Sequence, residues 1–305
     1  MKLEKPNFWI KKNCFAFIFY PLSLITYLTN FIKKFSSQNK FKIKTICVGN
    51  IYIGGTGKTT LAIEINNVLK KKFKTVFIKK YYKNQKDEIN LLKKNGKVIF
   101  SSKRLISLNI AERNNFDIAI LDDGLQQKNI KYDLKIVCFN STEGFGNGYL
   151  LPAGPLRESL YELKNYDVVF FNGEKSSLKF KKKIISLNKD LKIFESTYEP
   201  TNLKNFNKNK KYLMFCGIGN PKEFENTLLK FKFKIADKVI FPDHHQISNQ
   251  EIKNLKRKAT EKKLQIITTE KDYLRLKNKK KKNINFLKIK LKIEKLNEFK
   301  KILIR

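Results

Sequence analysis

The feature that most constrains the fold is a glycine-rich turn, whose sequence from Val48 to Thr60 is Val-Gly-Asn-Ile-Tyr-Ile-Gly-Gly-Thr-Gly-Lys-Thr-Thr. The apolar run from Ile43 to Val48 predicts a buried strand before the turn, and apolar residues at helical spacing predict a helix after it. Such a turn holds nucleotide phosphates, because glycines let the backbone approach them and the helix N-terminus favours negative charge. We therefore predict an ATP-using enzyme in which Lys58 supplies a mobile cation and Thr59 faces a metal ion. A purely structural strand-to-helix turn is the alternative.

Length and composition predict a folded protein of two domains. The chain has 305 residues, of which 41% are hydrophobic, and a formal net charge of +38. Such a charge is typical of proteins that bind nucleic acid or an anionic membrane. However, only six of the 65 basic residues are arginine, the residue that base recognition prefers, and the lysines are spread along the chain. We therefore expect no nucleic acid as the main ligand, whereas attraction to an anionic membrane surface stays open.

The four cysteines indicate a reducing compartment. Cys14, Cys47, Cys138 and Cys216 are far apart, lie mostly in apolar runs and form no Cys-x-x-Cys pair. This spacing is typical of reduced core cysteines in a cytosolic protein.

The N-terminal segment carries the membrane signal. From Cys14 to Ile32 there are 19 residues without a charge, flanked by lysine pairs, which is long enough for a span. However, Pro21 interrupts the segment, and Ser23, Thr26 and Asn30 share one helical face. We therefore predict a membrane-anchoring helix that lies in the interface or inserts partly. A buried core helix and a signal peptide are the alternatives, although lysines replace the small residues of a cleavage site.

Beyond residue 41, short apolar runs alternate with helical stretches, which predicts a P-loop NTPase-like α/β fold, a largely parallel sheet with helices on both faces. A lysine- and asparagine-rich patch at about 179–211 is typical of linker and surface structure. The alternation then restarts, and Ser248-Asn-Gln-Glu251 has the pattern of a capping box that begins a helix. We expect an N-terminal membrane-associated helix in residues 1–40, a P-loop kinase core in 41–205 and a smaller C-terminal α/β domain in 206–305.

Two acidic residues are expected at the edge of the sheet that lies next to the phosphate loop. Asp122 and Asp123 follow the apolar run from Ile118 to Leu121, which places them at the carboxyl edge of the sheet. Magnesium prefers hard oxygen ligands and commonly uses one or two carboxylates with phosphate oxygens. We therefore predict a metal site at this pair, and an ordinary Asp-Gly turn is the alternative.

Two further segments carry candidate charges. Arg157 and Glu158 stand in a glycine- and proline-rich loop of an arginine-poor chain, and such a loop positions a charge on a ligand. Both histidines lie in Asp243-His244-His245, where the Asp-His step can orient an imidazole that assists a hydroxyl nucleophile. Metal ligation and a plain loop role are the alternatives for the histidines.

Taken together, these segments resemble the tetraacyldisaccharide 4'-kinases of lipid A biosynthesis, in order and over nearly the whole chain. The motifs that carry the resemblance are Val48-Gly-Asn with Gly54-Gly-Thr-Gly-Lys-Thr59, Leu121-Asp-Asp-Gly-Leu-Gln126, Gly148-Tyr-Leu-Leu-Pro-Ala-Gly-Pro-Leu-Arg-Glu158, Gly217-Ile-Gly-Asn-Pro221, Phe241-Pro-Asp-His-His245 and Thr269-Glu-Lys-Asp272. The resemblance implies a membrane-associated enzyme on the cytoplasmic face of a Gram-negative inner membrane. That enzyme moves the γ-phosphate of ATP, with Mg²⁺, to the 4'-hydroxyl of a lipid A disaccharide 1-phosphate.

The resemblance also implies residue roles. Asp87, in a polar stretch that otherwise reads as a solvated turn, is the acid-base carboxylate, with His244 as its partner and Asp243 orienting the imidazole. Arg104 and Arg157 stabilise charge, and Asp123 and Lys58 complete the catalytic set. The implied metal ligands are Thr59, Asp122 and Glu158, and the implied nucleotide contacts are Ile53, Gly54, Gly55, Thr56, Gly57, Lys58, Thr59, Thr60 and Gln126.

The chain departs from the family pattern near the end of its second strand, where Lys79-Lys-Tyr-Tyr82 stands in place of Arg-Gly-Tyr-Gly.

The main alternative function is a membrane-peripheral P-loop NTPase that acts as a switch on a protein partner. A GTPase switch would carry Asn/Thr-Lys-x-Asp, whereas in Thr269-Glu-Lys-Asp272 the lysine adjoins the aspartate. The sequence identifies no protein partner.

Overall fold

The computed structural model describes residues 6–173, 176–277 and 280–305. The chain divides into two compact units, each described here by itself. The core unit comprises the described part of residues 5–81, 95–197 and 291–305, and the second unit comprises residues 82–94 and the described part of 198–290.

Relative to the predicted domains, residues 6–40 join the core unit and residues 198–205 join the second unit. Two further segments also change unit. Residues 82–94 belong to the second unit, where α3 (Lys86–Lys93) contacts α8 (Glu270–Arg275). Residues 291–305 belong to the core unit, because Phe299 of α9 (Leu296–Ile304) packs against Phe170 and Phe194, with ring centroids 4.7 and 5.2 Å away. Both assignments depend on long-range packing, which composition along the chain does not reveal.

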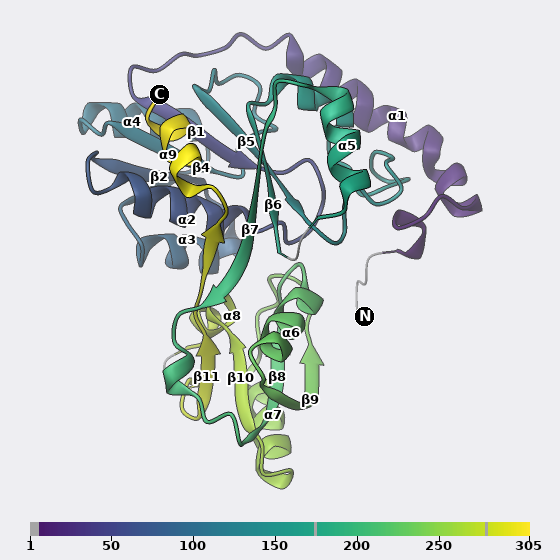
Figure 1. Ribbon diagram of the computed structural model, residues 1–305, viewed down its shortest axis with the longest axis vertical. Helices are drawn as coiled ribbons and strands as arrows, with labels where there is room; N and C mark the ends of the chain where they lie inside the picture. Colours follow the sequence, from purple (N-terminus) through teal and green to yellow (C-terminus); the bar gives the residue numbers. More distant parts are fainter. Residues whose placement is uncertain (1–5, 174–175, 278–279) are drawn as a thin grey trace. The chain divides into compact units, whose positions relative to one another are not determined.

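The core unit is built on an eight-stranded sheet in the order β12-β7-β6-β5-β1-β4-β2-β3. Figure 1 labels all of these strands except β12 and β3. Adjacent strands from β3 through to β7 pair in parallel. The strands are β1 (Lys44–Gly49), β2 (Thr75–Lys80), β3 (Val98–Ser101), β4 (Ile118–Asp122), β5 (Leu134–Asn140), β6 (Val168–Asn172), β7 (Lys192–Pro200) and β12 (Ile289–Ile293).

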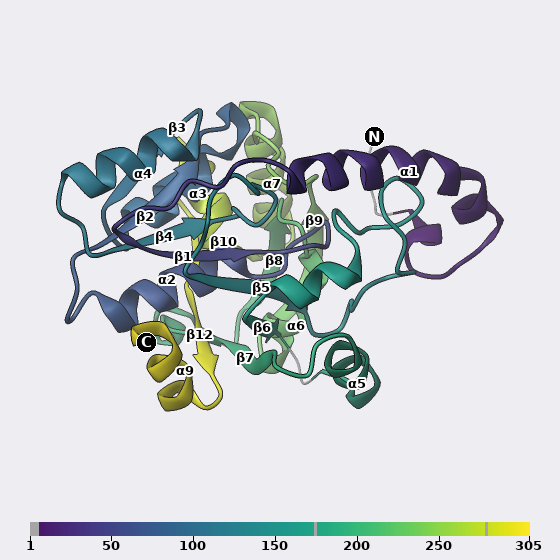
Figure 2. The ribbon, with the colours of Figure 1, turned by 90° about the horizontal axis from the view of Figure 1, so that it is seen from above.

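Helices cover both faces of the core sheet, as the sequence predicts. On one face, α4 (Arg104–Arg113) and α5 (Leu178–Leu187) contribute Leu108 and Ile184 to the same buried cluster. On the other, α9 contacts α2 (Lys58–Leu69) and packs against Phe170. Figure 2 shows α4 on one side of the sheet and α2 and α9 on the other.

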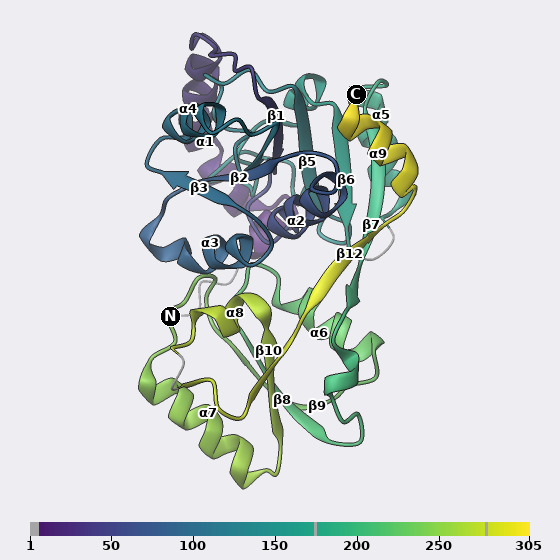
Figure 3. The ribbon, with the colours of Figure 1, turned by 90° about the vertical axis from the view of Figure 1, so that its left-hand side faces the viewer.

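The second unit has its own four-stranded parallel sheet in the order β11-β10-β8-β9. Its elements are β8 (Lys211–Cys216), α6 (Pro221–Lys230), β9 (Lys234–Ile240), α7 (Asn249–Glu261), β10 (Gln265–Thr269) and β11 (Ile284–Leu287), with α3 and α8. Leu228 of α6 and Leu255 of α7 belong to different buried clusters, and Figure 3 shows the two helices on either side of the sheet. The predicted capping box is confirmed, because Ser248 and Glu251 exchange both hydrogen bonds.

The prediction of linker structure at 179–211 is wrong over much of its length, because α5 and β7 occupy 178–187 and 192–200. In α5, Phe180 and Ile184 lie one turn apart and are buried. The abundance of lysines between them hid this amphipathic spacing.

The N-terminal segment forms η1 (Asn7–Trp9) and α1 (Cys14–Lys34). Pro21 does not interrupt α1, contrary to the prediction, and the helix runs through it. By length and composition α1 is able to cross a membrane, with a mean hydropathy of 1.6, and only 11% of that apolar window is buried. Because the helix is so exposed, the alternative of a buried core helix is wrong. Short 3-10 helices complete the fold: η2 (Lys83–Gln85), η3 (Leu160–Asn165) and η4 (Leu203–Asn205).

Candidate functional site

Strand register brings three candidate segments to one edge of the core sheet. β4 lies between β1 and β2, and Asp122 at its end pairs with Val48 on one side and with Lys79 on the other. The glycine-rich turn follows β1, so phosphate loop, aspartate pair and Lys79 meet at the carboxyl edge. This is the edge at which open parallel sheets bind ligands.

The phosphate loop is held in its conformation by hydrogen bonds from neighbouring residues. Gly57 has φ +77° and caps the N-terminus of α2, a backbone conformation that favours glycine. Thr56 accepts hydrogen bonds from Asn50 at its hydroxyl (3.0 Å) and from Asn172 at its carbonyl (2.7 Å). Lys58 is the first residue of α2. The predicted loop between strand and helix is therefore present, with a helix N-terminus behind it.

Asp122 is fully buried beneath this loop. Its Oδ2 accepts from the Thr59 hydroxyl (3.0 Å) and forms an ion pair with the Lys79 ammonium group (2.8 Å). Both charged side chains are almost fully buried. The Oδ1 atom of Asp122 is buried and has no hydrogen-bond partner among the described residues. A hydroxyl beside an unpartnered carboxylate oxygen is a donor set that fits Mg²⁺.

Asp123 has a different environment. Its φ of +60° lies in the left-handed region, which is rare outside glycine and is typical of functional sites. Arg157 Nη2 donates to Oδ1 at 2.8 Å, and the Lys58 ammonium group lies 3.8 Å from the same oxygen. Burial acts to raise the pKa of Asp123, but the charges of Lys58 and Arg157 outweigh it and hold that pKa well below its usual range. The neighbouring cations therefore favour the ionised form of Asp123.

Arg104 and Gln126 support the backbone around these acids. The Arg104 guanidinium group is buried and donates to the carbonyl of Asp123 at 2.5 Å. Gln126 Nε2 donates to the carbonyl of Asn50 at 2.9 Å. With Lys58, Lys79, Arg104 and Arg157 facing Asp122 and Asp123, cations outnumber carboxylates, which suits a polyanionic ligand.

Glu158 lies among other partners. Its buried carboxylate accepts from the Tyr166 hydroxyl and forms an ion pair with Lys128 at 3.0 Å. Among the described residues, no three His, Cys, Asp or Glu side chains are grouped as a metal site. The role of Glu158 as a metal ligand stays a prediction.

A second cluster of candidate residues lies in the second unit. Asp87, in the first turn of α3, is 2% exposed, and its Oδ2 accepts from Arg275 Nη2 at 2.8 Å. The other oxygen lies 3.4 Å from His244 Nδ1. Burial acts to raise the pKa of Asp87, but His244, Lys271 and Arg275 lower it below its usual value. The carboxylate is thus held ionised, as a proton acceptor must be.

His244 has the same unusual backbone as Asp123, with φ +60°. Asp243 accepts the backbone N–H of His244 at 2.9 Å, and its Oδ1 lies 3.8 Å from the His244 ring, farther than Asp87 does. His245 instead bonds Glu251 at 2.9 Å and stacks on Phe241. Of the two histidines, His244 is therefore the one associated with Asp87.

Sequence reasoning missed Lys79, Lys271 and Arg275 as members of these clusters. Arg275 donates to Asp272, to the carbonyl of Gly217 and to Asp87, at 2.6, 2.6 and 2.8 Å. The available signals were the scarcity of arginine and the position of Arg275 just after the Thr269-Glu-Lys-Asp272 motif.

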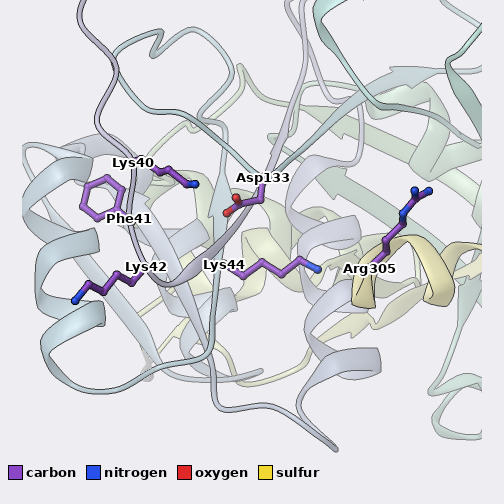
Figure 4. Close-up of a pocket in the computed structure, with 6 residues that line it drawn as sticks. All are labelled: Lys40, Phe41, Lys42, Lys44, Asp133 and Arg305. Carbon is purple, nitrogen blue, oxygen red and sulfur yellow. The ribbon is translucent and has the colours of Figure 1, made fainter.

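Two cavities lie in different parts of the chain. One of about 560 Å³ opens beside Asp87 and Arg275 in the second unit, where Lys83 and Lys86 also line it. The other, of about 580 Å³, is lined by Lys40, Phe41, Lys42, Lys44, Asp133 and Arg305 (Figure 4). None of the predicted site residues lines the cavity shown in Figure 4, so this cavity is separate from the candidate catalytic and binding residues.

Comparison with known proteins places the chain. Residues 15–305 match a family model described as tetraacyldisaccharide-1-P 4'-kinase. A tetraacyldisaccharide 4'-kinase from Pelagibacter ubique (strain HTCC1062) is 47% identical over 297 residues, covering 96% of this chain and 95% of the relative. One from Rickettsia bellii (strain OSU 85-389) is 34% identical, covering 90% of each chain.

A solved structure shares the fold. The crystal structure of LpxK from Aquifex aeolicus in complex with ATP matches with a TM-score of 0.71, covering 95% of this chain and 98% of that one. At 22% identity this likeness concerns the fold alone. Because the family model spans nearly the whole chain and curated relatives match it end to end, the chain belongs to the tetraacyldisaccharide-1-P 4'-kinase family.

Proposed function

We propose that this chain is a kinase that transfers the γ-phosphate of ATP to the 4'-hydroxyl of a tetraacyldisaccharide 1-phosphate in lipid A biosynthesis. In this proposal its two units have different roles. The core unit holds ATP, and Asp87 of the second unit accepts the hydroxyl proton. The observation that carries the proposal is the pairing of the Thr59 hydroxyl with Asp122 at the end of a phosphate loop surrounded by cations. Family membership supplies the reaction.

In this proposal, the nucleotide phosphates lie on the N-terminus of α2. Lys58 contacts them with its ammonium group, and backbone N–H groups of the loop donate to their oxygens. Thr59 and the unpartnered Oδ1 of Asp122 would hold Mg²⁺. When bound, Mg²⁺ neutralises phosphate charge. Asp123 keeps Arg157 aligned through their ion pair, so that the guanidinium group can stabilise the charge of the transferred phosphoryl group.

The proton-transfer step belongs to Asp87. The 4'-oxygen of the acceptor forms a bond to the γ-phosphorus, the bond from that phosphorus to the bridging oxygen of ADP breaks, and the hydroxyl proton passes to the Asp87 carboxylate. Arg275 and Lys271 keep this carboxylate ionised beforehand, and His244 lies beside its other oxygen. The pair formed by Asp87 and His244 thus acts as one acid-base unit.

We propose that α1 anchors the enzyme to the cytoplasmic face of the inner membrane. Large apolar side chains such as Ile18, Ile25 and Ile32 are 60–67% exposed along it. Lysine pairs flank the apolar stretch on both sides, which favours an anionic lipid surface. The acceptor is itself a lipid, so anchoring brings the enzyme to the surface where its substrate resides.

The test is transfer of label from [γ-³²P]ATP to the disaccharide 1-phosphate in detergent micelles. We expect Asp87→Asn to lower the turnover number about 10²–10⁴-fold, the range for loss of a general base, while ATP still binds. The matched control is Asp190→Asn, which removes an exposed carboxylate of the core unit and should leave transfer within twofold. If the wild type hydrolyses ATP without labelling the lipid, the proposal fails and a nucleotide switch becomes the better account.

A further inference from the structure

Three polar side chains of α1, those of Ser23, Thr26 and Asn30, contact the core unit. Ser23 Oγ donates to the carbonyl of Leu150 (2.9 Å), and Thr26 Oγ1 donates to the carbonyl of Leu151 (2.8 Å). Asn30 Nδ2 donates to the carbonyl of Arg157 at 2.7 Å. These donors are three and four residues apart, so they form one stripe along the helix. The helix is therefore fastened by its polar face to the segment 150–157.

That segment ends at an arginine of the phosphate site. The Arg157 N–H donates to the carbonyl of Ile51 at 2.7 Å, and its own carbonyl accepts from Asn30. Its Nη2 then donates to the carbonyl of Asn50 (2.7 Å) and to Asp123 (2.8 Å). The backbone of residue 157 is thus held between the strand-to-loop junction on one side and α1 on the other.

An ionic link runs parallel to this contact. Lys34, at the end of α1, pairs with Glu162 at 2.5 Å, and Lys128 lies 3.7 Å from Glu162 and 3.0 Å from Glu158. Glu158 directly follows Arg157 and is buried. The position of α1 is therefore coupled to residues 157 and 158 through two independent sets of contacts.

We propose that α1 is a positioning element for Arg157, with Asn30 as the positioning residue, so that seating of α1 in lipid sets the rate of phosphoryl transfer. The inference rests on the proposed function for the role of Arg157. Lipid holds the apolar face of α1, and the opposite, polar face then presents the Asn30 amide to the Arg157 carbonyl. When that donor is lost, the carbonyl loses the partner that Asn30 provides, and the guanidinium group is held less firmly on Asp123.

The experiment compares Asn30→Leu and Asn30→Asp, which both remove the amide donor, with Asn30→Gln, which keeps it. The control is Thr29→Val, since the Thr29 hydroxyl bonds only the Thr26 carbonyl within α1 among the hydrogen bonds described for it. All are assayed as the full chain on vesicles of phosphatidylethanolamine and phosphatidylglycerol that carry the acceptor. Thermal unfolding identifies any variant that is not folded at the assay temperature, and the other donor-less variant then provides the comparison.

We expect the donor-less variants to lower kcat roughly tenfold, which corresponds to about 1.4 kcal/mol, while the acceptor KM and vesicle binding stay within twofold. Asn30→Gln should recover at least part of the loss, and Thr29→Val should match the wild type. In an Arg157→Ala background, Asn30→Leu should have no further effect, because its contribution passes through Arg157.

The inference is overturned if kcat is unchanged, or if the loss caused by Asn30→Leu is as large in the Arg157→Ala background as in the wild type. Binding of ATP alone separates this inference from the proposed function. If the acceptor is not phosphorylated, the same double-mutant comparison on the ATP Kd still applies. If the inference is right, Asn30→Leu raises the ATP Kd of the wild type but not that of the Arg157→Ala variant. An equal rise in both backgrounds refutes the inference.

Discussion

Asp122 and Asp123 are neighbours in sequence but differ in environment, and this difference separates their roles. Asp122 ends a strand, is fully buried and is held by Thr59 and Lys79. Asp123 begins the turn with a left-handed backbone and faces Arg157 and Lys58. In the proposed mechanism, Asp122 would hold the metal cation, and Asp123 would align Arg157.

Replacing Lys79 tests the buried ion pair. We expect Lys79→Met to lower the free energy of unfolding by about 3–5 kcal/mol, because it leaves the Asp122 carboxylate buried without its cation. The double variant Lys79→Met/Asp122→Asn should regain part of that loss, since no lone charge remains. Urea denaturation measures both, and a loss under 1 kcal/mol in the single variant would contradict the pairing.

Replacing Arg275 tests what keeps Asp87 ionised. The pKa of Asp87 is lowered in the fold, so its ionised form stabilises the protein above the pKa of the unfolded chain, and this contribution is lost as pH falls through the folded-state pKa. In Arg275→Gln the pKa should rise. The acid limb of the kcat/KM profile should therefore move to higher pH, and the fall in unfolding free energy between about pH 5 and about pH 2 should shrink.

The matched control for this titration is Arg257→Gln, which removes an exposed arginine of α7. Its acid limb should coincide with that of the wild type. An unshifted limb in Arg275→Gln would mean that Arg275 does not set the ionisation of Asp87.

The proximity of residues near the glycine-rich turn was predictable from the sequence, because parallel strands bring their carboxyl ends to the same edge of the sheet. Asp122 ends β4, and Thr59 lies in the first turn of α2, just after the turn that follows β1. Their contact follows from two motifs and one sheet edge. The pairing of Lys79 with Asp122 requires β2 to lie beside β4, which periodicity does not specify. Arg275 meets Asp87 across 188 positions of sequence, and the short α8 that carries it gave no signal.

At the scale of elements, α1 has its large apolar side chains exposed and a stripe of three polar ones docked, the reverse of a helix on the surface of a soluble domain. The sequence predicted the stripe of Ser23, Thr26 and Asn30, which the structure confirms as a single face. It wrongly predicted an interruption at Pro21. A proline removes one N–H donor and crowds the preceding turn of the helix. Hydrogen bonds of Trp9 in η1 and of Ser23 in α1 to the carbonyls of Pro152 and Leu150 hold the segment on either side of it.

Charge placed on the exposed face of α1 should release the enzyme from lipid. We expect Ile25→Lys to lower binding to phosphatidylglycerol-containing vesicles roughly tenfold, since burial of an isoleucine side chain is worth about 1.5–3 kcal/mol. The control, Leu178→Lys, changes a 74% exposed leucine of α5 in the same unit and should bind as the wild type does. Sedimentation with vesicles measures both. Equal loss in the two variants would show that α1 is not the anchor.

At the scale of the whole molecule, the α/β architecture was predictable from alternating strands and helices, whereas the division of the chain was not. The second unit takes in residues 82–94, so the chain contributes Asp87 to that unit from within the stretch predicted as kinase core. This is why Asp87 reads as a solvated turn in sequence yet is 2% exposed in the fold.

If both units serve one reaction, their residues should act as a unit in kinetics. We expect Lys58→Ala and Asp87→Asn each to lower kcat by roughly 10² or more, and the double variant to be no slower than the worse single one. Only Lys58→Ala should weaken ATP binding, because Asp87 acts on the acceptor. Multiplicative losses would instead indicate that the two clusters contribute independently to the rate-limiting barrier.

The position of the new phosphate tests the account most directly. The product made from ATP and the disaccharide 1-phosphate is examined by ¹H–³¹P correlation NMR. The account predicts a second phosphomonoester resonance correlated with the proton on C4' of the distal sugar, and a much weaker one from Asp87→Asn after the same reaction time. A phosphate on any other carbon, or consumption of ATP to free phosphate alone, would contradict it.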